Sequence, residues 1–279
     1  MSDWTLTAVA DWSDLYDNAG NIPKGERWPG LWVEPAAAAR AALSSAGRAR
    51  LGLRYGPAER NRFDLFLPEG AAKGLVVYVH GGFWMGLDES FWSHLAAGPL
   101  AHGWAVAMPA YTLAPTIRIA GITREIGAAI AAAAAEVAGP IRLTGHSAGG
   151  HLVTRMLCED APLPGDVAAR IAMTVSISGL HDLRPLRRIG RNATLAIDAA
   201  EALAESPVLL TPREGARLIG WAGQRETSEF LRQNRILPEV WRGLGAATAF
   251  VEEPDRNHFT VVDGLADPAH PLTRALLEV

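Results

Sequence analysis

One short segment restricts the fold of this chain more than any other, the run G-H-S-A-G-G at residues 145–150. It follows an apolar run at residues 141–144 and precedes an apolar helical pattern at residues 148–159. A tight strand-to-helix turn brings backbone atoms close together, so small residues must flank the serine. The segment therefore predicts that Ser147 is raised above a sheet edge, with helix N–H groups directed at its surroundings.

Strand and helix patterns alternate along most of the chain. Residues 75–79 form a continuous apolar run, typical of a strand buried on both faces. This alternation predicts an α/β fold with a mostly parallel central sheet flanked by helices. Further strands are expected at residues 105–108, 141–144, 171–177, 216–221 and 248–252, and helices at residues 35–46, 89–102, 121–138, 148–159 and 227–244 and after Pro271.

Two regions depart from the alternation. Short strand patterns at residues 50–55 and 62–67 predict an antiparallel hairpin before the parallel strands. Residues 180–210 are rich in proline and arginine and are expected to form a small cap excursion over the sheet.

No repeat or linker divides the chain, so residues 1–279 are predicted to form a single domain. Within it, residues 1–50 are an N-terminal segment that we expect to cover the active site.

The composition excludes several classes of function. The chain carries 26 Lys+Arg and 30 Asp+Glu, a net charge of −4, and is 49% hydrophobic. It is too apolar to be disordered and too acidic to bind nucleic acid mainly by counterion release. A single cysteine, Cys158, excludes a disulfide framework. No metal or nucleotide motif appears, so no cofactor is expected.

The chain starts M-S-D-W, with no apolar run behind it, and its longest apolar tract, residues 126–138, is too short to span a membrane. We therefore expect a cytoplasmic protein with no membrane partner. The expected partner is a small molecule. A homodimer is compatible with the sequence, which leaves the oligomeric state open.

A second glycine-rich loop, H-G-G-F-W at residues 80–84, directly follows the apolar run at residues 75–79. Such a loop turns backbone N–H groups toward a carbonyl oxygen. With the N–H of Ala148, the N–H groups of Gly82 and Phe83 are predicted to form an oxyanion hole. His80 is expected to be structural, because a general base should come later in the chain.

Nucleophilic catalysis by Ser147 requires a base and an acid, in the chain order serine, acid, histidine. His258 follows the expected strand at residues 248–252 and is the predicted base. Glu226, 32 residues before it, is the favoured acid, and Asp182 is the alternative. The other histidines fit this order and position less well: His94, His102, His146, His151, His181 and His270.

These motifs resemble those of the α/β-hydrolases, and the resemblance covers nearly the whole chain. Within that fold, residues 80–84 resemble the H-G-G-x-W motif of the kynurenine formamidases (arylformamidases), and residues 179–186, 223–233 and 257–259 resemble segments of the same branch. The resemblance implies a Ser147–His258–Glu226 triad. Glu226 departs from the pattern, because the animal enzymes carry aspartate there. The two glycine-rich motifs also resemble those of the hormone-sensitive-lipase-like esterases.

The resemblance implies a serine hydrolase, with an aryl formamide such as N-formylkynurenine as the favoured substrate. A short-chain carboxylesterase is the alternative, and a non-catalytic ligand-binding homologue is the third reading. The predicted substrate-binding residues are Trp84, beside the oxyanion loop, Gly81, which shapes that loop, and Tyr16, one of several N-terminal aromatic residues.

Overall fold

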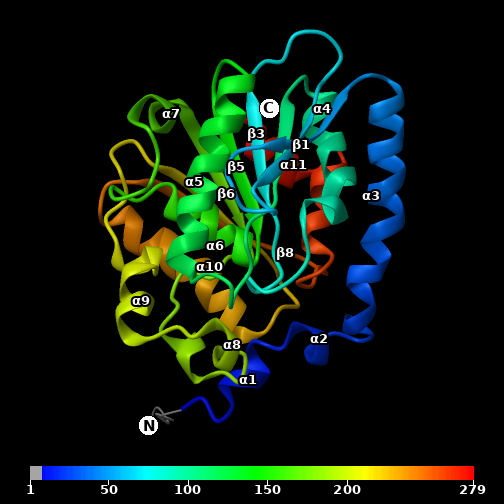
Figure 1. Ribbon diagram of the computed structural model, residues 1–279. Coiled ribbons are helices and arrows are strands. Elements are labelled where there is room, and N and C mark those ends of the chain that lie inside the picture. Colours follow the sequence, from blue (N-terminus) through cyan, green and yellow to red (C-terminus); the bar gives the residue numbers. More distant parts are fainter. Residues whose placement is uncertain (1–7) are drawn as a thin grey trace.

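The computed structural model describes residues 8–279, so the N-terminal Trp4 lies outside the described part of the chain. Within residues 8–279 the strands form one sheet in the order β1-β2-β4-β3-β5-β6-β7-β8 (Figure 1). β2 pairs with β1 and with β4 in antiparallel fashion, and the other pairs are parallel. The predicted mostly parallel sheet is therefore confirmed. The strands are β1 (Ala49–Arg54), β2 (Arg62–Phe66), β3 (Leu75–Val79), β4 (Ala105–Pro109), β5 (Ile141–His146), β6 (Ile171–Ile177), β7 (Arg217–Gly223) and β8 (Ala247–Glu253).

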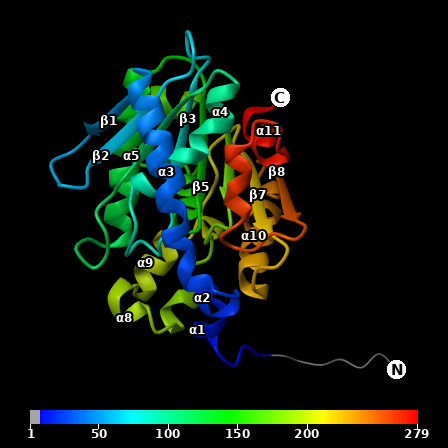
Figure 2. The ribbon, with the colours of Figure 1, turned by 90° about the vertical axis from the view of Figure 1, so that its right-hand side faces the viewer.

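Helices cover both faces of the sheet, and side chains alternate between two cores. In β3, Leu75, Val77 and Val79 join one core cluster, and Val76 and Tyr78 join the other. The first cluster packs under α5 (Ile119–Glu136), α6 (Ala148–Arg155) and α10 (Ser228–Arg242). The second packs under α3 (Trp28–Ser45), α4 (Ala97–Ala101) and α11 (Pro271–Leu277), the face turned forward in Figure 2.

Several elements differ from the predicted ones. The helix expected at residues 89–102 is a 3-10 helix, η2 (Glu89–Ala96), followed by α4, whose first turn tolerates Pro99. α3 begins at Trp28 and passes through Pro35, because the buried Trp32 anchors the preceding turn in the core. The sequence patterns missed the short helices α1 (Trp12–Leu15), α2 (Asn18–Asn21), η1 (Gly25–Arg27), α7 (Gly165–Arg170) and η5 (Val261–Ala266).

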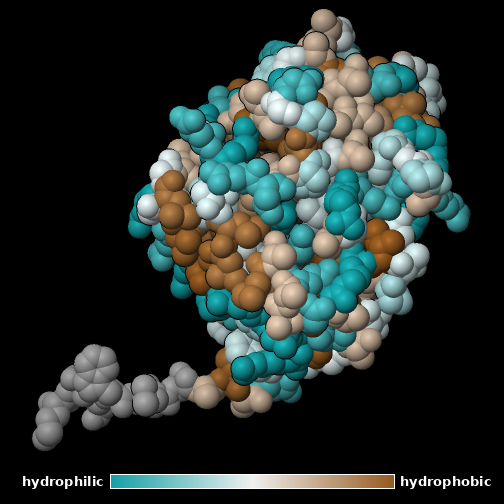
Figure 3. Space-filling view, turned by 60° about the vertical axis from the view of Figure 1, so that its left-hand side comes forward, coloured by the Kyte–Doolittle hydropathy of each residue, from teal (hydrophilic) through white to brown (hydrophobic). Residues whose placement is uncertain are grey.

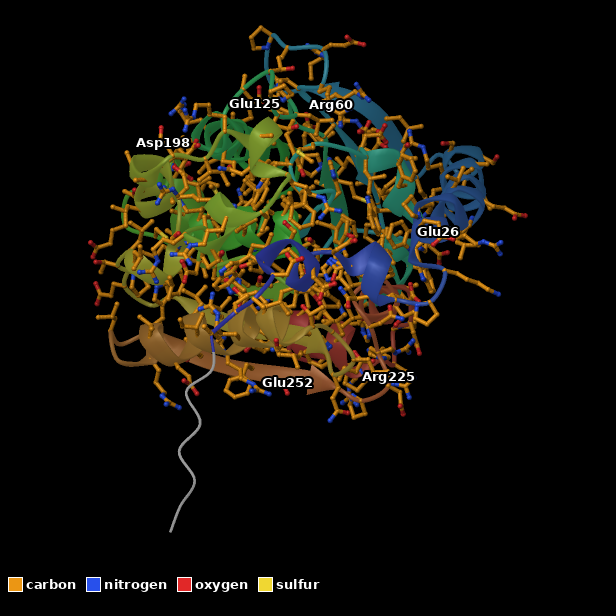
Figure 4. The ribbon with its side chains drawn as sticks, turned by 90° about the horizontal axis from the view of Figure 1, so that it is seen from below. Glu26, Arg60, Glu125, Asp198, Arg225 and Glu252 are labelled. Atoms are coloured by element: carbon orange, nitrogen blue, oxygen red, sulfur yellow. The ribbon has the colours of Figure 1, made fainter. Side chains whose placement is uncertain are left out.

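The cap region, residues 180–210, contains several short helices. They are η3 (Pro185–Arg188), α8 (Asn192–Leu195), α9 (Ala199–Ala204) and η4 (Pro207–Leu209). Figure 4 looks at the end of the molecule where α1 and α2 cross the centre, with Glu26 on the α3 side and Asp198, in the cap region, on the opposite side. The N-terminal segment and the cap region thus flank the same end of the sheet.

The surface is mixed in polarity, with one hydrophobic area on the face shown in Figure 3. No helix in residues 8–279 is both long enough and apolar enough to cross a lipid bilayer. The homodimer stays a prediction.

Candidate active site

Ser147 lies in the turn between β5 and α6, with φ 56° and ψ −116°. This left-handed backbone conformation is strained for a residue with a side chain and is typical of a nucleophile held by its surroundings. The N–H of Ser147 donates to the Ile177 carbonyl at 2.8 Å, which ties the turn to β6. A Cβ on Gly149 would overlap the Val79 carbonyl oxygen. The close approach of the Val79 backbone therefore requires glycine at this position.

Gly149→Ala is therefore expected to lower the free energy of unfolding by about 1–3 kcal/mol through overpacking. The matched control is Gly165→Ala, at the start of α7, where an added Cβ meets nothing within 4 Å. The control should be as stable as the wild type or more stable, because alanine favours helix. Urea unfolding measures both, and equal stabilities of the two variants would contradict the close approach at Gly149.

Glu226 and His258 are joined by a hydrogen bond in which the imidazole Nδ1 lies 2.7 Å from Glu226 Oε2. The other carboxylate oxygen, Oε1, accepts from the Ser178 hydroxyl at 2.6 Å and from the Gly223 N–H at 2.7 Å. Both side chains are buried. Three donors therefore fix the carboxylate, and the carboxylate fixes the ring orientation and places the proton of a neutral imidazole on Nδ1.

Asp182, the alternative acid, has other partners. Its carboxylate accepts from Arg184 Nε at 2.8 Å and lies 3.4 Å from Arg232 Nη1. Burial alone would raise the pKa of Asp182, but hydrogen bonding and charge from Arg184 hold it below its ordinary value. No hydrogen bond joins Asp182 to His258 within residues 8–279. The structure therefore brings Glu226, rather than Asp182, to the histidine.

The oxyanion loop after β3 has a run of left-handed backbone angles, with φ 107° at Gly82, 51° at Phe83 and 56° at Trp84. A Cβ on Gly82 would overlap the Gly86 carbonyl, so the loop needs glycine there. The N–H groups of Gly82, Phe83 and Ala148 donate no hydrogen bond within residues 8–279. These three donors are free to bind an oxyanion.

His80 packs against this loop and stabilises its conformation. Its ring stacks on Tyr111 with centroids 4.3 Å apart, and its Nδ1 lies 2.7 Å from the Gly81 carbonyl oxygen. Complete burial lowers the pKa of His80 to about 4, so the ring is neutral at physiological pH. These contacts agree with the structural role that the sequence predicted.

Ser147, His258, Gly82 and Phe83 line one cavity of about 380 Å³. No hydrogen bond joins Ser147 Oγ to His258 within residues 8–279, and such bonds are often long until substrate binds. Residues of the N-terminal segment, among them Asn18, Gly25 and Trp32, supply part of the wall. That residues 1–50 cover the active site stays a prediction. The remaining lining residues are Ala19, Glu26, Pro29, Met85, Gly86, Leu87, Trp92, His146, Arg191 and Phe259.

The predicted substrate-binding residues need correction, because Trp84, Gly81 and Tyr16 do not line this cavity. Trp84 turns away from it, is fully buried, and packs edge-on against His151 at 5.2 Å. The Gly81 backbone packs directly against Ser147, where a Cβ would lie 3.1 Å from the serine Cβ.

Tyr16 fastens the N-terminal segment to α10 instead. Its hydroxyl donates to Glu229 Oε1 at 2.5 Å and accepts from Gln233 Nε2 at 3.0 Å. The side chain is fully buried, so it positions the segment that forms part of the cavity wall.

The aromatic wall is built from other residues. Trp32 in α3 and Trp92 in η2 lie with ring centroids 4.2 Å apart, and Phe259 lies 5.9 Å from Trp32. The only sequence signals for these residues are the tryptophan-rich N-terminus and the position of Phe259 beside His258. Arg191, from the cap region, carried no signal except membership of an arginine-rich stretch.

His146 lies behind the base. Its Nε2 is 2.8 Å from the His258 carbonyl oxygen, and the two rings are 4.6 Å apart. Burial and the neighbouring His258 lower the pKa of His146 well below its ordinary value. A neutral His146 places no positive charge beside the His258 ring. In residues 8–279 no group of three or more His, Cys, Asp or Glu side chains is arranged to hold a metal ion.

Comparison with known proteins agrees with this architecture. Residues 76–214 match the alpha/beta hydrolase fold family. The kynurenine formamidase of Danio rerio is 27% identical over 236 residues, which cover 81% of this chain and 80% of that protein. A crystal structure from Silicibacter sp., provisionally named a thioesterase, is 47% identical, covers 95% of this chain and 98% of its own, and has a TM-score of 0.90. Esterase B from Lactobacillus rhamnosis shares the fold at 17% identity over 91% and 92% of the two chains, with a TM-score of 0.62.

The chain belongs to the alpha/beta hydrolase fold family. Its relatives named kynurenine formamidase make it a hydrolase enzyme, and the reading as a non-catalytic binding protein is set aside.

Proposed function

We propose that this hydrolase uses Ser147 as nucleophile, His258 as general base and Glu226 as the acid that orients the histidine. The observation that carries the proposal is the 2.7 Å hydrogen bond from His258 Nδ1 to Glu226, beside a strained serine in the same cavity. With Nδ1 protonated, the neutral ring leaves Nε2 to accept the serine proton.

In this mechanism Ser147 Oγ attacks the substrate carbonyl carbon while its proton moves to His258 Nε2. The oxygen of the tetrahedral intermediate is held by the N–H groups of Gly82, Phe83 and Ala148. The bond to the leaving amine or alcohol breaks as His258 returns the proton to it. Water then attacks the acyl-serine and gives one proton to His258. As the second tetrahedral intermediate collapses, His258 returns that proton to Ser147 Oγ, which releases the carboxylic acid and free Ser147.

The proposed substrates are aryl formamides and small aryl esters. Kynurenine formamidases from three animals are 24–27% identical over about four-fifths of the chain. The aromatic wall of Trp32, Trp92 and Phe259 offers apolar surface to an aryl leaving group. Phe83, in the oxyanion loop, also lines the cavity. We propose that its ring limits the room for an acyl chain.

A thioester is the second candidate substrate class, because the 47% identical Silicibacter protein carries the provisional name thioesterase. The same acyl-enzyme chemistry cleaves thioesters and esters, so the leaving group distinguishes the two proposals. Short-chain carboxylesterase activity belongs to the first proposal and is measured with it.

The test is kcat/KM for a formanilide, for aryl acetate, butyrate and hexanoate, and for acetyl and butyryl thioesters. We expect formanilide cleavage, and a fall from acetyl to hexanoyl, because each blocked methylene costs about 10-fold or more. Preference for hexanoate without formanilide cleavage would replace the formamidase proposal with a general esterase. Thioester rates far above both other classes would establish the second candidate.

Phe83→Gly examines the cause of this acyl preference. Removing the ring should flatten the decline from acetyl to hexanoyl esters. It should also lower the acetate rate, because glycine loosens the loop that presents the oxyanion donors. An unchanged chain-length profile would show that Phe83 does not limit the acyl side.

A further inference from the structure

The cavity contains one permanently charged cation, Arg191, which the proposed mechanism does not use. Its guanidinium carbon lies 4.8 Å from the centroid of the Phe83 ring. Phe83 also supplies one of the three N–H groups predicted to form the oxyanion hole, with those of Gly82 and Ala148. The cation therefore lies against a residue of the oxyanion loop.

The position of Arg191 is anchored through the backbone around it. Arg191 is the residue directly before α8, and the preceding Gly190 N–H donates to Ser13 Oγ at 3.0 Å. This bond fastens the cap region to the N-terminal segment. The contact between the cap region and the N-terminal segment therefore positions the Arg191 guanidinium at the cavity.

Within residues 8–279 the Arg191 guanidinium makes only long hydrogen bonds. Nη2 lies 3.3 Å from Asp17 Oδ1, and Nη1 lies 3.4 Å from the Tyr16 carbonyl oxygen. The Arg191 and Asp17 side chains are 37% and 42% exposed, and ion pairs of this exposure contribute little. Of the five N–H donors of the guanidinium, these two contacts leave most free for a ligand.

Apart from the partly exposed Asp17, no carboxylate in residues 8–279 forms an ion pair with Arg191 at the cavity. Glu26, the carboxylate in its wall, is 71% exposed and lies 3.9 Å from Arg27. Figure 4 shows it at the α3 side of the N-terminal segment. Solvent screens Glu26 more strongly than Arg191, whose side chain is 37% exposed and lies over the Phe83 ring.

We infer that Arg191 binds a carboxylate on the substrate, so that the enzyme selects aryl formamides or aryl esters whose leaving group carries a negative charge. The inference rests on the proposed function and adds the substrate class to it. A planar guanidinium forms paired, charge-assisted hydrogen bonds with a carboxylate, and stacking on Phe83 holds the plane in place. The aromatic wall and the cation then recognise two parts of one leaving group.

The test compares 3-(2-formamidophenyl)propanoate with its uncharged amide, 3-(2-formamidophenyl)propanamide, which has nearly the same shape. The wild type should show a kcat/KM about 10-fold or more higher for the acid, the size of a charge-assisted hydrogen bond. Arg191→Met should bring the acid-to-amide ratio close to one. Arg191→Lys should give an intermediate ratio, because lysine keeps the charge and loses the paired geometry.

Arg188→Met is the matched control, because Arg188 comes from the same cap region, stacks on Trp12 at 5.9 Å, and does not line the cavity. It should keep the wild-type ratio. An acid-to-amide ratio near one in the wild type, or a ratio unchanged by Arg191→Met, would overturn the inference. An equal loss for both substrates would show that Arg191 supports the loop or the oxyanion instead, and would also overturn it.

Binding to Ser147→Ala protein, measured by calorimetry with the same acid and amide, separates this inference from the proposed function. A tighter Kd for the acid that Arg191→Met abolishes supports the anion site even if the wild type cleaves no formamide. Equal Kd values for acid and amide contradict the anion site even if formamides are cleaved.

Discussion

We expect Ser147→Ala to lower kcat/KM for aryl formamides and esters by about 10⁴-fold or more, and His258→Ala to lower it to a similar extent. The proposed roles of the two side chains depend on each other. Without His258 the Ser147 hydroxyl is a poor nucleophile, and without Ser147 the histidine has no nucleophile to deprotonate. Residual turnover comes from the three N–H donors of the oxyanion site, which both variants retain.

Steady-state kinetics with a formanilide and an aryl acetate measure the loss, and thermal unfolding checks that each variant is folded. His102→Ala is the control histidine, since its half-buried side chain contacts only the Pro268 carbonyl oxygen among its hydrogen bonds within residues 8–279, and it does not line the cavity. It should retain wild-type rates. A His258→Ala variant that kept a tenth of wild-type activity would place the general base elsewhere.

We expect Glu226→Gln to lower kcat by at least about 10²-fold, because a neutral amide cannot stabilise the imidazolium. The surroundings of Glu226 add to the effect. The Ser178 hydroxyl and the Gly223 N–H both donate to Oε1, so the glutamine oxygen stays with them and its NH₂ faces His258. That NH₂ favours an imidazole with an unprotonated Nδ1, and the proton then occupies Nε2, the nitrogen that must accept from Ser147.

Asp182→Asn is the comparison for this variant, and its kcat should fall far less. The asparagine loses charge against Arg184 and Arg232, so its main effect is on stability, which unfolding measurements detect. The opposite ranking of the two kcat losses would make Asp182 the acid.

The features of this protein that could be predicted from sequence are those that are determined by residues close together along the chain. The turn around Ser147 needs Gly149 because the Val79 backbone passes close by, and the oxyanion loop needs Gly82 because its φ is 107°. Both requirements appear as glycines within a few positions of the functional residue. The alternation of strands and helices could be predicted from local patterns as well. A strand that is buried on both faces needs a continuous apolar run, such as residues 75–79.

The cavity wall could not be predicted in this way, because it depends on which side of the fold each aromatic residue faces. Trp84 is next to the oxyanion loop in sequence, yet its positive φ turns the side chain into the core against His151. Trp32 lies far from Ser147 in sequence and reaches the cavity because α3 extends farther toward the N-terminus than expected. Arg191 arrives through the cap region, whose short helices have no clear periodicity.

The most direct test of the account is covalent labelling with a fluorophosphonate, followed by mass spectrometry of the modified peptide. The reagent captures a serine that is activated by a base and stabilised by an oxyanion site, so it reports the nucleophile without requiring the natural substrate. We predict one adduct per chain, on Ser147, no adduct in Ser147→Ala, and much slower labelling in His258→Ala. A stoichiometric adduct on a different residue, or wild-type turnover by Ser147→Ala, would contradict the account.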